Sequence, residues 1–98
     1  MVKQNYSIVV GITAVRAVHS LKTRSSLVIA NTSATAVLYY GSDNSVTVTS
    51  GIPIQPKTNA VFLRGLGDRP DLERWVVSDT AATDVRIGEE TEQYAEVV

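Results

Sequence analysis

The sequence predicts an all-β fold, either a small antiparallel β-sandwich or a jelly-roll-like barrel of about eight short strands. Two observations support this prediction. Short apolar runs rich in β-branched residues recur along the chain, and clusters of Gly, Asn, Asp and Ser separate them. Residues 27–54 show both features, because they read LVIANTSATAVLYYGSDNSVTVTSGIPI. Within this stretch, residues 46–49 alternate apolar and polar side chains, as a half-buried strand does.

The size and composition of the chain fit one globular domain without covalent or metal cross-links. A chain of 98 residues buries roughly two-thirds of its unfolded surface when it folds. The sequence has no cysteine and a single histidine, which excludes a disulfide framework and a multi-histidine metal cluster. No apolar run approaches the roughly 20 residues of a membrane-spanning helix. We therefore expect no membrane partner.

The turn signals divide the chain into a central domain and two terminal segments. Residues 14–21 fit either a strand or an amphipathic helix, and their β-branched content favours the strand. Residues 1–6 and 89–98 lack the patterning of core strands. We therefore expect a flexible N-terminal arm, a β-sandwich domain over residues 7–88 and an acidic C-terminal tail. Strands are expected at residues 7–13, 14–21, 27–31, 36–40, 46–49, 60–64, 72–78 and 84–87.

The strand at residues 36–40 is apolar on both faces. Val37 and Tyr39 share one face, and Leu38 and Tyr40 share the other. Such a strand is covered on both sides, or it presents one face to a partner. We expect Tyr39 in the core and Tyr40 directed outward. The residues expected in the core are Val28, Ile29, Val37, Tyr39, Val61, Leu63, Val76 and Ile87.

The residue types that perform chemistry do not form a catalytic pattern. His19 is the only side chain that titrates near neutrality, and no carboxylate or nucleophile lies near it in the sequence. The Gly-containing loop at residues 65–70 is followed by a predicted strand and not by the helix that a phosphate site requires. Asp68, Asp71 and Glu73 lack the spacing of a calcium-binding loop. We expect no enzymatic activity, no cofactor and no metal ion.

Charge is distributed unevenly, although the net charge is −1. Residues 1–42 carry four basic side chains and no acid, whereas residues 79–98 carry six acids and one arginine. Opposite charge at two ends favours attraction between copies or docking on a charged surface; the alternative is that the acidic end is a solvated tail. Tyr6 is the aromatic residue interleaved with the N-terminal basic residues, and one ring is too few for base stacking. A nucleic-acid partner is not expected.

The order of short segments in residues 26–87 resembles a known family. These segments are VIANTS at 28–33, VLYYG at 37–41, VTVT at 46–49, GIPIQP at 51–56 and VRI at 85–87. Their order is similar to that of small β-sandwich virion proteins of tailed bacteriophages, and the resemblance covers about two-thirds of the chain. It implies a capsid-decorating (cement) protein that binds the assembled phage head and stabilises it, usually as a homotrimer.

The resemblance also implies the partners and the location of the protein. The partners would be further copies of the chain and the major capsid protein of a phage head. The location would be the capsid surface of the virion, after synthesis in the host cytoplasm. The charged ends, the terminal segments and the outward tyrosine are the expected contact regions. The expected partner-binding residues are Lys3, Tyr6, Arg16, Lys22, Arg24, Tyr40, Glu89, Glu90, Glu92 and Tyr94.

A second hypothesis belongs to a different functional class. A monomeric carbohydrate- or ligand-binding β-sandwich would use Trp75 and a tyrosine as a stacking platform. The oligomeric state separates the two hypotheses, because a decoration protein is expected to be a trimer and the binding module a monomer.

Overall fold

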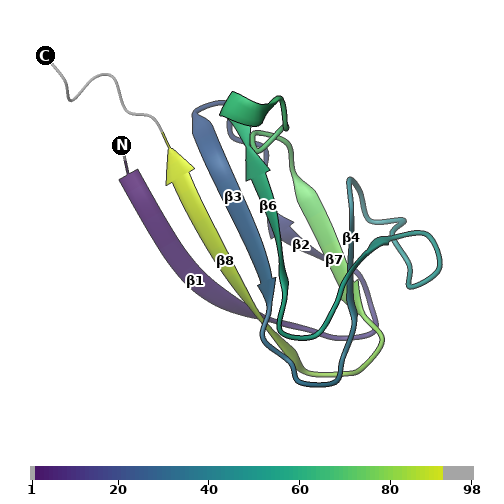
Figure 1. Cartoon of the computed structure of the whole chain (residues 1–98). Helices are drawn as coiled ribbons and strands as arrows, with labels where there is room; N and C mark the ends of the chain where they lie inside the picture. Colours follow the sequence, from purple (N-terminus) through teal and green to yellow (C-terminus); the bar gives the residue numbers. More distant parts are fainter. Residues whose placement is uncertain (1, 92–98) are drawn as a thin grey trace, which may run out of the picture.

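The computed structural model describes the backbone of residues 2–91 and the side chains of residues 3–91. Two antiparallel sheets pack face to face as a small β-sandwich, which confirms the predicted fold class (Figure 1). A single turn of 3-10 helix, η1, follows the sixth strand. The elements are β1 Val2–Val10, β2 Val15–Val18, β3 Arg24–Asn31, β4 Leu38–Gly41, β5 Ile52–Ile54, β6 Asn59–Leu63, η1 Arg64–Leu66, β7 Arg74–Ser78 and β8 Thr83–Thr91.

The two sheets differ in the length of their strands. One sheet has the order β1-β8-β3-β6 and contains the strands of eight and nine residues, and we call it the long sheet. The other has the order β2-β7-β4-β5, with strands of three to five residues, and we call it the short sheet. All strand pairs in both sheets are antiparallel.

The core lies between the inner faces of the two sheets. Alternate residues of β3 face inward, so Leu27 and Ile29 are fully buried. The neighbouring β8 contributes Ile87 by the same alternation, and the short sheet contributes Leu38 and Val76. Asn31 is also buried, and its amide nitrogen donates to the carbonyl groups of Ala36 and Ile54. These bonds attach the end of β3 to the short sheet.

The predicted core faces are wrong for two strands. In β4, Leu38 and Tyr40 contact the core, and Tyr39 lies on the opposite face. In β6, Phe62 is buried, whereas Val61 and Leu63 are exposed. Each strand is apolar on both faces, so alternation alone does not determine which face is buried. Pairing with the neighbouring strands determines which face is buried. Of the predicted core set, Ile29, Val76 and Ile87 are buried, and Val28 lies on the outer face of its sheet.

Residues 42–51 form a loop, and the strand predicted at residues 46–49 is absent. The loop brings the buried Val46 side chain against two glycines. A Cβ atom at Gly41 would lie 2.9 Å from the Val46 Cβ atom, and one at Gly51 would lie 2.7 Å from the Tyr39 Cβ atom. Asp43 and Thr47 accept local hydrogen bonds that stabilise turns here, so turn chemistry outweighs the alternating pattern.

The terminal segments differ from the sequence-based expectation. The predicted N-terminal arm is part of β1, because Val2 to Tyr6 pair with Thr91 to Ile87 of β8. Glu89 to Thr91, assigned to the acidic tail, are the last residues of β8. Residues 92–98 lie outside the described residues. The ambiguous stretch at residues 14–21 contains strand β2, as its β-branched content indicated.

Candidate interaction surface

No second layer of described residues covers the outer face of the long sheet (Figure 1). Strand pairing arranges its side chains in rows across the four strands. The central row reads Asn5, Gly88, Val28 and Val61, from β1 to β6. The two rows beside it are Lys3, Glu90, Ser26 and Leu63, and Ser7, Arg86, Ala30 and Asn59.

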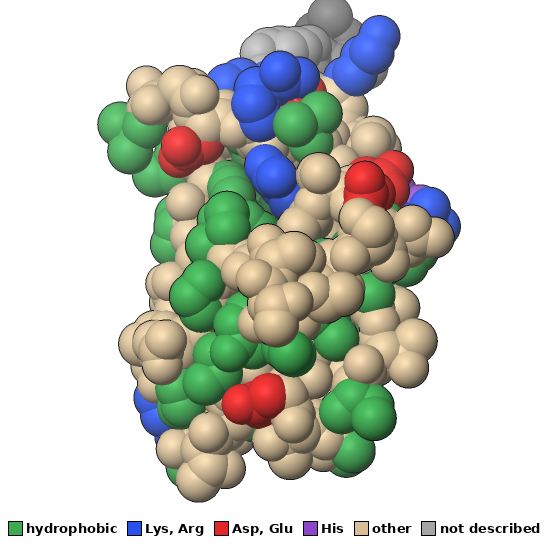
Figure 2. Space-filling model, turned by 90° about the vertical axis from the view of Figure 1, so that its right-hand side faces the viewer, with side chains coloured by type: hydrophobic (Ala, Val, Ile, Leu, Met, Phe, Trp, Pro, Cys, Tyr) green, Lys and Arg blue, Asp and Glu red, His purple; other side chains and the backbone are tan. Residues whose placement is uncertain are grey.

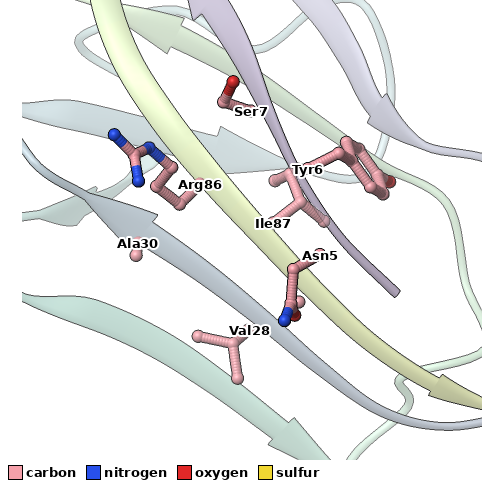
Figure 3. Close-up of a pocket in the computed structure, with 8 residues that line it drawn as sticks. Asn5, Tyr6, Ser7, Val28, Ala30, Arg86 and Ile87 are labelled. Atoms are coloured by element: carbon pink, nitrogen blue, oxygen red, sulfur yellow. The ribbon is translucent and has the colours of Figure 1, made fainter. Parts of the chain in front are cut away.

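A shallow groove crosses this face at Gly88. Because glycine has no side chain, β8 is low between the Asn5 side chain on β1 and the Val28 side chain on β3 (Figure 3). The groove has a volume of about 510 Å³ and reaches Arg86 along β8. A smaller hollow shares Asn5, Val28 and Gly88 and extends the groove toward Glu90. The sheet therefore carries a continuous depression along its second strand.

Apolar side chains elsewhere on the same face are accessible to solvent. Val61 is 47% exposed and Leu63 is 37% exposed on β6, and Val9 is 70% exposed on β1. Val28 is half-buried beside Gly88. Outward aliphatic side chains on one rigid sheet are characteristic of a protein contact surface.

The charged side chains on the same face are paired within the chain. The Arg86 guanidinium lies 2.9 Å from Asp84, and the Lys3 ammonium lies 3.9 Å from Glu90. The Thr32 hydroxyl and then Arg86 lower the pKa of the Asp84 carboxyl group by hydrogen bonding. With two positive and two negative groups, these four side chains have no net charge, so the face does not repel another copy.

A buried ion pair lies at the end of the sandwich where β3 begins. Arg24 is 2% exposed, and its Nε atom donates to Glu89 at 2.6 Å. Its two terminal nitrogens donate to the carbonyl oxygens of Pro70 at 3.0 Å and His19 at 2.8 Å. Both charged groups are enclosed. Arg24 and Glu89 therefore hold the chain together and are not the partner contacts that the sequence suggested.

Tyr6 lies beside this ion pair on the inner side of β1. It is 37% exposed, and its hydroxyl donates to the Ala17 carbonyl oxygen at 3.4 Å. Burial and then the neighbouring Glu89 carboxylate raise the pKa of Tyr6. Three of the predicted partner-binding residues, Tyr6, Arg24 and Glu89, therefore lie together and interact within the chain.

Three further predicted contact residues lie apart from the groove. Tyr40 faces the core and packs edge to face against Phe62, with ring centroids 5.4 Å apart, so it is not presented outward. The Arg16 guanidinium lies over the Trp75 ring at 6.0 Å on the short sheet. Lys22 is exposed near η1, and its carbonyl oxygen accepts a hydrogen bond from Arg64.

Lys3 and Glu90 are the predicted residues that lie on the grooved face, where they form an ion pair. Glu92 and Tyr94 lie outside the described residues. Sequence reasoning missed Gly88, which creates the groove, because the last predicted strand ends at residue 87. Gly88 could have been found from its position opposite Val28, which leaves a gap beside an apolar side chain. Finding that position requires the register between β3 and β8.

Basic side chains gather at the end of the molecule that contains η1 and the start of β1 (Figure 2). Hydrogen bonds connect several of them: Arg64 donates to the carbonyl groups of Lys22 and Arg24, and Arg74 donates to that of Arg69. Arg69 also forms an ion pair with Asp71 at 3.0 Å. This end is a second surface, separate from the grooved face.

The described residues contain no group of three or more His, Cys, Asp and Glu side chains with the proximity of a metal site. The loop acids have structural contacts, because Asp68 accepts a hydrogen bond from the Leu63 amide and Asp71 pairs with Arg69. None of the helical segments between residues 2 and 91 is long and apolar enough to span a membrane.

Comparison with known proteins gives little further information. No family model matches the chain, and no curated protein matches it. A chain from a solved structure described as "Bacillus endospore appendages form a novel family of disulfide-linked pili" is similar over 93% of this chain and 86% of its own length. The TM-score is 0.48 and the sequence identity is 12%. A similarity of this size says nothing about function.

Proposed function

We propose that this chain is a structural accessory protein of a virion, which decorates the assembled head of a tailed bacteriophage and stabilises it. The observation that carries the proposal is the outer face of the long sheet. No second layer of described residues covers it, and it carries exposed Val61 and Leu63 beside an apolar groove. A decoration protein needs such a contact surface and no reaction centre.

The order of strands and turns along the chain supports the specific role. Residues 28–41 contain the second half of β3, which ends at the buried Asn31, a polar link at residues 32–37, and β4. This is the arrangement that the resemblance to small virion proteins implies. The proposed stoichiometry of three copies and the proposed binding to a major capsid protein follow from the resemblance alone.

The carbohydrate-binding alternative has less geometric support. A sugar-stacking platform needs an open aromatic face. Arg16 lies over the Trp75 ring, and the indole nitrogen donates to Glu73 at 2.7 Å. Tyr39 shares the outer face of the short sheet, but the 42–51 loop packs close to it at Gly51. The two rings therefore lack the free surface that a saccharide would require.

Co-sedimentation with capsids tests the proposal. The chain is mixed with undecorated heads, which are assembled from the major capsid protein encoded in the same genome as this sequence. We expect saturable co-sedimentation, and we expect decorated heads to withstand a higher temperature before they lose their contents. A genome without a capsid protein, or heads that do not retain the chain, would exclude the decoration role.

A shortened variant that ends at Thr91 tests the contribution of the acidic C-terminal segment. This variant keeps every described strand, because β8 ends at Thr91. We expect the variant to show lower occupancy on the heads than the full chain. We also expect the occupancy of the full chain to fall more steeply as salt rises, since salt screens charge attraction beyond about 8–10 Å. Equal occupancy for the two would assign the binding to the folded domain.

A further inference from the structure

We propose that the outer face of the long sheet binds the same face of a second copy of this chain, with a two-fold axis parallel to the strands between β8 and β3. The inference goes beyond the proposed function: it concerns the free chain without capsids, where a second copy occupies the face that is proposed above as the contact surface, and it gives two copies in place of three. The sedimentation experiment below contains no capsids, so it can fail independently of decoration.

The axis follows from the place of β8 and β3 in the sheet. They are the two central strands of the order β1-β8-β3-β6. A two-fold axis between them places β8 over the partner's β3 and β1 over the partner's β6. All four strands of each copy are then covered. Sheets that pack face to face keep their strands within about 30° of each other, and this arrangement allows that geometry.

The rows of side chains are complementary in size under this axis. In the central row, Val28 of each copy lies over the partner's Gly88 and fills the groove. In the two adjacent rows, Arg86 lies over the partner's Ala30, and Glu90 lies over the partner's Ser26. On these two central strands, large side chains meet small ones in all three rows, which favours close packing there. On the outer strands, Asn5 lies over the partner's Val61 and Lys3 over the partner's Leu63.

The alternative axis, which runs across the strands at Gly88, fits less well. It would place β8 over the partner's β8, so the two grooves at Gly88 would coincide and leave an unfilled space. The half-buried Val28 side chain would meet the partner's Val28. Because apolar cavities weaken an interface, the axis parallel to the strands is favoured.

The charge and the area of the face indicate how tightly the two copies should bind. The ion pairs of Lys3 with Glu90 and of Arg86 with Asp84 leave the face neutral. Four strands spaced about 4.8 Å apart and about seven residues long cover roughly 450 Å² per copy, or roughly 900 Å² in total. This area is below that of a standard stable complex. We therefore expect a reversible dimer with a dissociation constant in the micromolar range.

Sedimentation equilibrium over a micromolar to sub-millimolar range tests the pairing through size changes on the two central strands. Val28→Ala should weaken the dimer at least about tenfold, because both copies lose the groove-filling side chain. Gly88→Val should weaken it by a similar factor, since its side chain would meet the partner's Val28. The double variant Val28→Ala/Gly88→Val places the large side chain at position 88 and the small one at position 28. Each large side chain again lies over a small one of the partner, so most of the affinity should be recovered.

A matched pair of lysine variants tests whether this face is used at all. Val61→Lys places a charge in the central row, whereas Ile12→Lys makes the same kind of change at an exposed site that is 70% accessible and outside the strands. We expect the first to give monomers and the second to dimerise normally. Far-UV circular dichroism and urea unfolding confirm that each variant is folded.

Several results would overturn the proposal. A monomer at every concentration or a trimer would exclude the dimer, and the trimer would favour the stoichiometry that the resemblance implies. Tighter association of Gly88→Val would indicate that the two glycines lie opposite each other. Equal behaviour of Val61→Lys and Ile12→Lys would place the contact elsewhere.

Discussion

The Nε atom of Arg24 lies 2.6 Å from a carboxylate oxygen of Glu89, and both side chains are buried at one end of the sandwich. Their strands are neighbours in the long sheet. The same guanidinium reaches the carbonyl groups of His19 and Pro70, so one side chain connects four segments of the chain. A charge in this position is tolerated because each of its three nitrogens donates a hydrogen bond.

Removing Arg24 should be costly for this reason. Arg24→Ala leaves the Glu89 carboxylate buried without its partner and two carbonyl groups without a donor. We expect a loss of about 3–5 kcal/mol in the free energy of unfolding, measured by urea denaturation. Arg86→Ala is the control, since its ion pair with Asp84 is exposed and should be worth less than about 1 kcal/mol. Equal losses for the two variants would contradict the enclosed ion pair.

A pair of adjacent residues in β3 tests the assignment of inner and outer faces. Ile29 is fully buried, whereas Val28 lies on the outer face. Ile29→Ala should lower the free energy of unfolding by about 2–5 kcal/mol, because it leaves a cavity in the core. Val28→Ala, measured at a concentration where the chain is monomeric, should cost less than about 1 kcal/mol. The reverse order would mean that the strand is shifted by one residue.

Two glycines outside the regular strands test the packing of the 42–51 loop. Gly51→Ala would place a Cβ atom 2.7 Å from the Tyr39 Cβ atom and 2.8 Å from a Val46 methyl group. We expect it to destabilise the protein by about 1–3 kcal/mol, because the loop must move away from the sheet. Gly65→Ala has no atom within 4 Å of the new Cβ atom and should be nearly neutral. Thermal unfolding of the two variants provides the comparison.

The raised pKa of Tyr6 predicts a loss of stability in alkaline solution. Burial favours the neutral phenol in the folded state, whereas the unfolded tyrosine ionises near pH 10. The stabilising contribution is therefore fully present below about pH 10 and is lost as the pH rises above that value. Urea unfolding of the wild type and Tyr6→Phe at successive pH values should show a steeper alkaline decline for the wild type. Parallel curves would contradict the raised pKa of Tyr6.

The sequence predicted the fold class because that prediction depends on local signals. Apolar runs separated by turn residues place strands such as β3 and β7 close to their observed positions. The sidedness of β4 and β6 depends instead on which strand each one pairs with, and no local pattern contains that information. Tyr39 and Tyr40 illustrate the point, since both positions suit an apolar side chain and only the register assigns one of them to the core.

The candidate surface was also only partly predictable, because charge is visible in the sequence and strand pairing is not. Lys3 and Glu90 were identified from charge, and they do lie together on the grooved face. Arg24 and Glu89 were identified from charge as well, but the fold buries them, because β3 and β8 are adjacent and their side chains alternate in direction. Gly88 creates the groove because it lies between the side chains of Asn5 on β1 and Val28 on β3. The sequence of β8 alone does not show these neighbours.

The pairing of β1 with β8 also determines when the sheet can form. Val2 lies opposite Thr91, so the first and last described strands are hydrogen-bonded neighbours. On a ribosome that synthesises the chain from its N-terminus, β1 has no partner until the final strand emerges. Pairings between such distant segments make folding slow, on the order of milliseconds to seconds, because a long loop must close before β1 and β8 can form their contacts. During that interval β1 is an unpaired apolar-rich edge, so chaperone binding or low temperature should increase the yield of folded protein more than it would for a sandwich with sequential strand pairing.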